Sequence, residues 1–133
     1  EALSIAQIAP NIAGAVVVTT PQDVAILDSS KAVKFVEQMG LKVLGIIENM
    51  SGMVCPHCGE EVDLFGQGGG KKAAGDLGVP YLGRIPLDPD MRKAGDEGRP
   101  FIIRSPGMSA DNPTWKHVDA VMQAVLRSIE ETE

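Results

Sequence analysis

The stretch GAVVVTT at residues 14–20 decides the fold class of this chain. It is a run of small and β-branched residues without polar alternation, which is typical of a strand buried on both faces of a parallel sheet. The stretches KVLGII at residues 42–47 and VPYLGRIP at residues 79–86 indicate two more strands. Apolar residues at helical spacing over residues 23–39 predict a helix between the first two strands, and Gly40 ends it. This order predicts an α/β fold, with an open, mostly parallel sheet and βαβ crossovers.

The remaining segments are predicted to be helices and loops around this sheet. The stretch GQGGG at residues 66–70 precedes a short helix that Gly78 ends, and residues 88–94 form one or two helical turns. In the last helix, Asn112 can cap the first turn and Pro113 suits it. Its apolar residues recur at helical spacing and are expected to be core or docking positions: Trp115, Val118, Met122, Val125 and Ile129.

Composition and charge are those of a soluble globular protein with an aliphatic core. The chain has 133 residues, 44% of them apolar, with only one Trp, one Tyr and three Phe. Its net charge of −6 disfavours nucleic-acid binding, because no basic stripe is present to neutralise phosphates. No apolar run approaches the roughly 20 residues that span a bilayer, and residues 1–4 carry no targeting pattern. We therefore expect a cytoplasmic protein, in a reducing compartment where paired cysteines usually serve metal or redox chemistry.

Cys55 and Cys58, the only two cysteines, lie in the sequence VCPHCG at residues 54–59. A Cys-x-x-Cys turn directs two thiolates at one point, which is half of a tetrahedral sulfur site for zinc or for an iron–sulfur cluster. A closed site needs four ligands. The other two must therefore come from a second copy or a partner, or the site must be open. His57 is interpreted as a solvated turn residue.

Other interpretations of the cysteine pair have weaker support. A redox-active dithiol normally opens a helix, where the helix dipole lowers the thiol pKa. Here Gly59, Glu60 and Glu61 follow, a poor helix start whose acidic residues are expected to raise that pKa. A disulfide across so short a loop gains little stability. Inert thiols are a third alternative, and we favour metal or cluster binding.

Candidate ligand-binding residues lie where the predicted strands end, because ligands bind at the carboxyl edge of an open parallel sheet. The segments at residues 48–50 and 86–88 are two of these ends, and a cysteine loop predicted over residues 51–64 leaves from the same edge. The glycine run is not a P-loop, since Lys72 stands where Ser or Thr is needed. We interpret it as a flexible loop that leads into a helix. No Ser/His/Asp or Cys/His catalytic set is recognisable.

Several segments within about residues 1–103 match one known family in the same order. They read VVVTTPQDVA (16–25), LGIIENMS (44–51), CPHCG (55–59), LFG (64–66), LGVPYLGRIPLDP (77–89) and GDEGRP (95–100), with Arg92. In combination the chain resembles the Mrp/ApbC family of P-loop ATPases, relatives of the MinD group that carry iron–sulfur clusters. Any single segment is weak evidence for this family, whereas the combination of segments in this order is specific to it.

The resemblance implies a P-loop NTPase-like fold. Residues 1–103 would be the C-terminal half of the ATPase domain, and residues 104–133 a polar loop and a helix packed on the same domain. It also implies a homodimer in which Cys55 and Cys58 of both copies hold one bridging 4Fe–4S cluster. Such a protein would pass clusters to iron–sulfur recipient apoproteins.

The same resemblance implies a nucleotide site. Asn49 matches the asparagine that recognises adenine, and Pro86, Leu87 and Asp88 match the loop that packs beside the base. In the complete domain, ATP and Mg²⁺ would be bound and ATP hydrolysed to drive cluster assembly or transfer. The family's Walker A loop and switch carboxylates have no counterpart in this sequence, so we expect the chain alone neither to bind ATP tightly nor to hydrolyse it.

Two other functions are compatible with parts of the sequence. A zinc-stapled structural or binding module without turnover would use the same cysteines. A MinD-like membrane-positioning ATPase would need a basic amphipathic C-terminal helix, but residues 128–133 read SIEETE, so no membrane partner is expected.

Residues 16–19 and 43–47 read as buried on both faces, yet only three strands are predicted. We therefore expect an open strand edge and marginal stability of the isolated segment.

Overall fold

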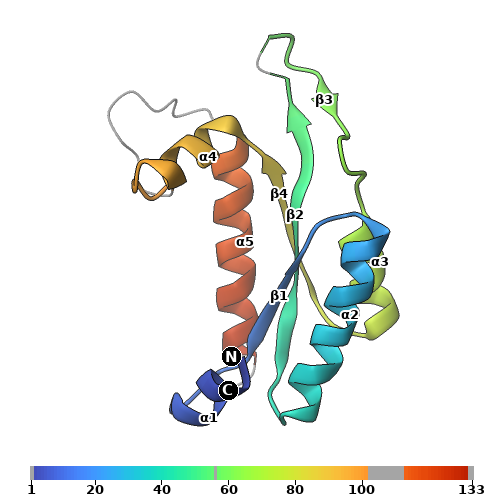
Figure 1. The fold of residues 1–133 in the computed structure, drawn as a ribbon, viewed down its shortest axis with the longest axis vertical. Coiled ribbons are helices and arrows are strands. Elements are labelled where there is room, and N and C mark those ends of the chain that lie inside the picture. The colour runs from blue at the N-terminus through green and yellow to red at the C-terminus, as the bar shows by residue number, and fades with distance from the viewer. Residues whose placement is uncertain (1, 56, 102–112, 132–133) are drawn as a thin grey trace.

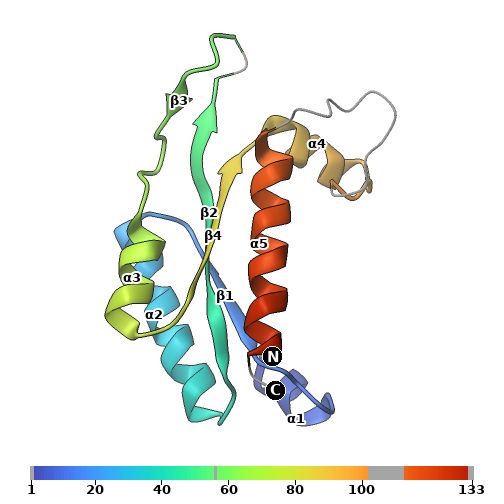
Figure 2. The same cartoon turned by 180° about the vertical axis from the view of Figure 1, so that it is seen from behind.

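The protein folds into three layers, as the computed structural model shows over residues 2–55, 57–101 and 113–131 (Figures 1 and 2). In chain order the elements are α1 (Ala2–Ile8), β1 (Ala15–Thr19), α2 (Asp23–Gln38), β2 (Val43–Val54), β3 (Glu61–Val62), α3 (Gly69–Leu77), β4 (Tyr81–Leu87), α4 (Pro89–Asp96) and α5 (Pro113–Glu130). One sheet lies in the middle, with α2 and α3 on one face and α5 on the other. The predicted α/β class is confirmed.

Strand β2 is the centre of the sheet. It pairs in parallel with β1 on one edge, where Val17 lies opposite Ile46, and with β4 on the other edge, where Asn49 lies opposite Ile85. The side chains of residues 43–48 are all buried. This continuous burial is what an apolar run without alternation predicts for a central parallel strand.

Aliphatic side chains pack on both faces of the sheet. Under α2 and α3 the buried cluster consists of Val17, Val33, Val36, Val43, Ile46, Ala73 and Ala74. Under α5 a smaller cluster consists of Ile47, Leu82 and Val121. Helix α5 is also held by a buried hydrogen bond of 2.7 Å that Ser128 Oγ donates to the carbonyl of Leu44.

One expectation about burial is wrong. Val18 of β1 is 56% exposed, so β1 is not buried on both faces. In α5 the buried positions are Thr114, Val121 and Ser128, and Val125 of the expected apolar face packs against the cluster under the helix. Met122 is 48% exposed, so it is not a core position, and a docking role for it stays a prediction.

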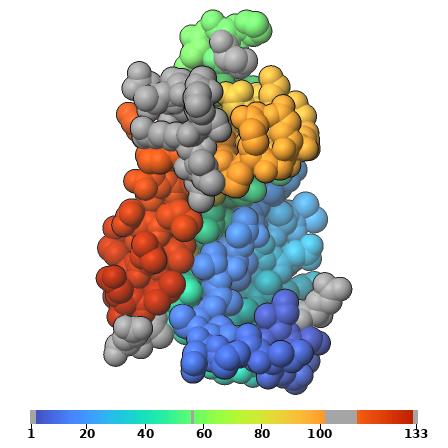
Figure 3. Space-filling model, turned by 90° about the vertical axis from the view of Figure 1, so that its left-hand side faces the viewer, coloured from blue at the N-terminus to red at the C-terminus, as the bar shows by residue number. Residues whose placement is uncertain are grey.

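The segment after Asn49 departs most from its prediction. It was expected to be a loop over residues 51–64, but β2 continues to Val54 and β3 returns antiparallel to it. The cysteines therefore stand on a β-hairpin that extends beyond the rest of the sheet (Figures 1 and 3). Met53 pairs with both β3 and β4, so this part of β2 is a strand because it has partners on both edges.

A bulge separates the buried part of β2 from the hairpin. The register against β4 shifts between Asn49 and Met53. Within this interval Met50 and Gly52 have positive φ values of 54° and 76°. Bulges of this kind redirect side chains and are common beside functional sites.

The short helices largely agree with their predictions. Helix α3 begins within the glycine run, at Gly69, and Gly78 ends it in the left-handed conformation with φ of 68°. Helix α4 is slightly longer than residues 88–94, and Asp88 caps it by accepting a hydrogen bond of 2.8 Å from the Asp90 N–H. The predicted cap at Asn112 lies outside the described residues.

Candidate functional site

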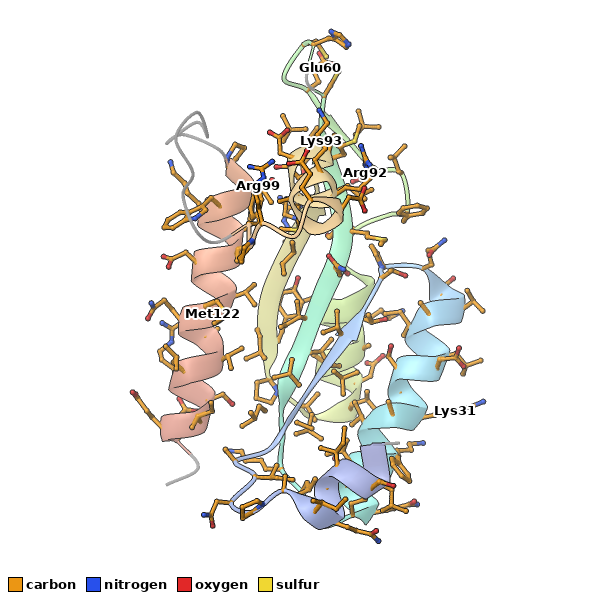
Figure 4. All side chains as sticks on the ribbon, turned by 60° about the vertical axis from the view of Figure 1, so that its left-hand side comes forward. Lys31, Glu60, Arg92, Lys93, Arg99 and Met122 are labelled. Carbon is orange, nitrogen blue, oxygen red and sulfur yellow. The ribbon has the colours of Figure 1, made fainter. Side chains whose placement is uncertain are left out.

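The tip of the hairpin carries both cysteines as free thiols. Cys55 is half-buried and Cys58 is exposed. The Cys55 N–H donates to the Glu60 carbonyl at 2.9 Å, and the Gly59 N–H donates to the Cys55 carbonyl at 2.9 Å. Gly59 has φ of 75°, a conformation that favours glycine, so the sequence permits this tight turn. Figure 4 shows Glu60, two residues after Cys58 in the sequence, near the outer end of the molecule.

The backbone of the turn lowers the pKa of the Cys55 thiol below its ordinary value. The principal cause is a hydrogen bond from the backbone of Cys58, followed by one from the backbone of His57. These N–H groups stabilise the thiolate, which is the form that ligates metals. The expectation that acidic neighbours would raise the thiol pKa is therefore wrong for Cys55.

The hairpin offers a metal two thiol ligands per chain, Cys55 and Cys58. In the described part of the chain, no three side chains of His, Cys, Asp or Glu gather into a group that could hold a metal ion. His57 is exposed. Two convergent thiols suit half of a sulfur-ligated site. Their chemistry and exposure fit a centre that is completed from outside the chain.

The predicted nucleotide residues come together at the carboxyl edge of the sheet. Asn49, Pro86, Leu87 and Asp88 line one hollow of about 180 Å³, together with Met50, Met91 and Arg92. The Met50 N–H donates to Asn49 Oδ1 at 2.9 Å. This bond orients the amide. Among the described residues no acceptor for its Nδ2 group is found, so its two donors can serve a ligand.

A buried carboxylate next to Asn49 was missed by the sequence analysis. Glu48 is 0% exposed. It accepts hydrogen bonds from the N–H groups of Gly70 at 2.7 Å and Gly68 at 3.2 Å, and from Ser51 Oγ at 2.5 Å. Glu48 therefore connects the end of the buried part of β2 to the start of α3, where N–H groups lack partners within the helix.

The glycine run is part of this packed contact, which corrects its interpretation as a flexible loop. A Cβ atom at Gly70 would lie 3.0 Å from the Cβ of Glu48, too close without a shift. The signal available in the sequence was an acidic residue directly after a buried strand, combined with glycines opposite it. Neither feature alone indicates that the two segments, 22 residues apart, are in contact.

A larger hollow of about 480 Å³ lies beside β4. Its lining includes Lys71, Tyr81, Arg84 and His117, besides Glu48. Burial lowers the pKa of His117, and the positive charge of Arg84 lowers it further. Burial also raises the pKa of Tyr81, with a smaller contribution from Glu48. The neutral forms of both side chains are thus favoured here.

Comparison with known proteins identifies the family. Residues 1–126 match the profile of the ParA family described as NUBPL iron-transfer P-loop NTPase. This chain belongs to that family. The resemblance to Mrp/ApbC and MinD-related ATPases is thereby confirmed.

The family relatives are much longer than this chain. The chain is 52% identical over 103 residues to an iron–sulfur cluster carrier protein of Methanocaldococcus jannaschii, a match covering 77% of the chain and 36% of the relative. It is 42% identical over 133 residues to an iron–sulfur cluster carrier protein of Saccharolobus solfataricus, covering 100% of the chain and 44% of the relative. The chain thus spans less than half the length of these relatives, and its division at residue 103 stays a prediction.

Solved structures support the fold. A nucleotide-binding protein of Archaeoglobus fulgidus in complex with ADP is 42% identical, with a TM-score of 0.57 over 65% of this chain and 35% of that one. The cell-division ATPase MinD of Pyrococcus furiosus shares the fold at 22% identity, with a TM-score of 0.58 over 90% of this chain and 43% of that one. The predicted P-loop NTPase-like fold is confirmed. None of the described helices is long and apolar enough to span a bilayer.

Proposed function

We propose that this chain is the cluster-binding portion of an iron–sulfur cluster carrier. Cys55 and Cys58 of two copies bind one bridging 4Fe–4S cluster, which is the cargo passed to recipient apoproteins in the cytoplasm. In the complete domain, ATP is bound and hydrolysed to drive assembly or transfer of the cluster. Names of relatives such as the cluster carrier of M. jannaschii support this proposal.

The observation that carries the proposal is the pair of free thiols at the end of the hairpin, of which Cys55 is half-buried and Cys58 is exposed. A tetrahedral metal or cluster site needs four ligands, and this hairpin supplies two. Because the pair projects beyond the sheet, a second copy can approach it without displacing the core (Figure 3). A two-fold arrangement of identical hairpins completes the ligand set with no further residue type.

The hollow at the carboxyl edge supports the nucleotide part of the proposal. Its volume of about 180 Å³ suits a flat base rather than a whole nucleotide. The oriented Asn49 amide offers hydrogen-bond donors to a ring nitrogen of adenine. The segment from Pro86 to Asp88 forms the adjacent wall, and the phosphates would be held by residues outside this chain.

Anaerobic reconstitution with iron and sulfide tests the cluster. We expect roughly one cluster per dimer, seen as broad absorption near about 400 nm together with a dimeric mass. A stoichiometric cluster on a strict monomer, without an added thiol, would overturn the bridging arrangement. Tight binding of colourless zinc with no cluster would favour the zinc-stapled module instead.

Calorimetry tests the nucleotide site. Mg-ATP should bind the 133-residue chain with a dissociation constant of about 1 mM or weaker, because the phosphate cradle that supplies most of the affinity is missing. In a full-length form that carries the P-loop, Asn49→Ala should weaken nucleotide binding more than cluster binding. Micromolar binding with turnover by the short chain would show that the phosphate site has been misplaced.

A further inference from the structure

A polar network ties the base of the cysteine hairpin to the sheet. Arg84 Nη1 of β4 donates to the Ser51 carbonyl of β2 at 3.0 Å and to Glu61 Oε1 of β3 at 2.8 Å. Gln67 Nε2 donates to the same Glu61 oxygen at 2.8 Å. Arg84 is thus a single side chain that contacts both strands of the hairpin.

The network crosses β2 at Gly52, where any side chain would push the members of the network aside. Met53 pairs with β3 on one edge and with β4 on the other, so Arg84 must reach across β2 to meet Glu61. A Cβ atom at Gly52 would lie 2.7 Å from Gln67 Nε2 and 2.8 Å from Glu61 Oε1. The φ of 76° at Gly52 is also one that glycine adopts without strain. The crossing therefore depends on the bare backbone of the bulge.

Within residues 2–55, 57–101 and 113–131, the strands of the hairpin bury little side-chain surface. Strand β3 consists of Glu61 and Val62, and both residues are exposed. Val54, the last residue of β2, is 40% exposed. A two-stranded hairpin without a buried face is marginally stable in water. The polar contacts at its base therefore have a large share in fixing its direction.

Through Ser51 the network also reaches Glu48, the residue before Asn49, and the start of α3. Ser51, whose carbonyl accepts from Arg84, donates its hydroxyl to Glu48. Glu48 in turn accepts from the N–H groups at the start of α3. At Ser51 the outgoing strand is consequently anchored to the Glu48 carboxylate and to the Arg84 guanidinium. The returning chain is anchored to the same carboxylate through the Gly68 N–H.

We propose that Arg84 and Glu61, packed over Gly52, form a clamp that holds the cysteine hairpin in a fixed direction relative to the sheet. Arg84 is a positioning residue, because it touches the strands that carry the thiols and not the thiols themselves. Its consequence for the cargo rests on the proposed function: a hairpin with a fixed direction presents Cys55 and Cys58 to a shared cluster.

Amide hydrogen exchange in the metal-free full-length protein tests the clamp directly. Arg84→Met and Glu61→Gln should accelerate exchange of the Cys55 and Gly59 amides by about five- to tenfold, as expected for loss of a partly exposed charged hydrogen bond. The Ile46 amide, which donates to the Pro80 carbonyl in the central sheet, should not change. Combining the two substitutions should add little, because Arg84→Met removes the guanidinium and Glu61→Gln removes the negative charge of the same ion pair.

Matched controls separate this role from a general effect of charge. Arg99→Met and Glu97→Gln remove the same types of side chain from another exposed ion pair, after α4 (Figure 4). They should leave hairpin exchange unchanged. Arg84→Lys keeps a cation and should restore part of the protection. Unchanged hairpin exchange in Arg84→Met, or an equal acceleration at Ile46, would overturn the clamp.

Cluster retention provides the second readout. In reconstituted protein, Arg84→Met should lose its cluster to a chelator about five- to tenfold faster than the unmodified protein, in parallel with hairpin exchange. Faster exchange with unchanged cluster loss would overturn the positioning role and leave the proposed function intact. If the unmodified protein takes up no cluster, the proposed function fails, and exchange in the metal-free protein alone decides whether the clamp exists.

Discussion

The central sheet and the cysteine hairpin share one strand, β2, yet the two ends of this strand are stabilised in different ways. Residues 43–48 are buried between helices on both faces, where aliphatic packing holds them. The hairpin beyond the bulge is exposed and is held by hydrogen bonds from Arg84 and Gln67 to Glu61. Stability and the proposed function thus lie at opposite ends of one element. Substitutions at one end should have little effect at the other.

Removing a thiol should have the largest effect and should be confined to the hairpin. Cys55→Ala or Cys58→Ala is expected to abolish cluster binding, because two ligands per chain are the minimum for a bridged site. The unfolding midpoint of the metal-free protein should shift by less than about 2 °C. Metal analysis and thermal unfolding measure the two effects, with His57→Ala as the control that keeps the cluster. A large loss of stability in the cysteine variants would contradict the separation.

A core substitution should have the opposite effect. Ile46 is 1% exposed, and Ile46→Ala should lower the free energy of unfolding by about 3–4 kcal/mol through lost burial and a residual cavity. Val62→Ala on the hairpin, where the side chain is 38% exposed, should cost less than about 0.5 kcal/mol. Urea titration of both variants gives the comparison. Similar costs at the two positions would mean that the hairpin is packed more tightly than its exposure indicates.

The open edge of the sheet should limit the stability of the isolated chain. In the described residues β1 has β2 as its only strand partner, so its other edge can pair with other chains. We expect the 133-residue segment to be marginally stable and to self-associate, and to be rescued when the missing half of the domain is supplied in trans. Light scattering and unfolding at several concentrations measure this. Cooperative unfolding of a dilute, cluster-free monomer at a midpoint of ~45–65 °C would contradict it.

Glu48 lies where the two regions meet and should have an intermediate effect. Glu48→Ala leaves the N–H groups of Gly68 and Gly70 and the Ser51 hydroxyl without their acceptor, at an expected cost of about 2–3 kcal/mol. Chemical denaturation measures the cost, and hydrogen exchange should show that the start of α3 loosens first. Glu48→Gln is the matched variant, since it keeps one acceptor and should be less destabilising. An unchanged free energy of unfolding in Glu48→Ala would show that water replaces the carboxylate as the hydrogen-bond acceptor.

His117 should give a small dependence of stability on pH. Its folded-state pKa lies below the ordinary 6.5, chiefly because of burial and then because of Arg84. The unfolded chain therefore binds more protons than the folded chain just below pH 6.5, and stability should fall as the pH drops through this region. Unfolding midpoints between about pH 7.5 and 5.5 measure the slope, and His117→Gln should reduce it. An unchanged slope in that variant would assign the effect to other groups.

The sequence by itself determined the parallel sheet at the centre of the molecule, and it named candidate site residues whose roles stay predictions. Apolar runs without alternation predicted parallel strands at residues 14–20 and 42–47. The burial on both faces that this pattern indicates is found in β2 but not in β1, where Val18 is exposed. The predicted ends of two strands indicated the places of Asn49 and Asp88, although β2 continues past Asn49 to Val54. The cysteine pair was equally clear, since two sulfur ligands at that spacing form a local unit.

Only the tertiary structure decided how the cysteines are carried. The strand character of residues 51–54 comes from partners on β3 and β4, and the clamp joins Arg84 to Glu61 across 23 residues. The fit of Gly70 against Glu48 likewise joins segments that are distant in the chain. Periodicity reports which face of a local element is apolar, but it carries no information about which distant polar groups meet. Those contacts depend on the register between strands, which is established only when the whole sheet is assembled.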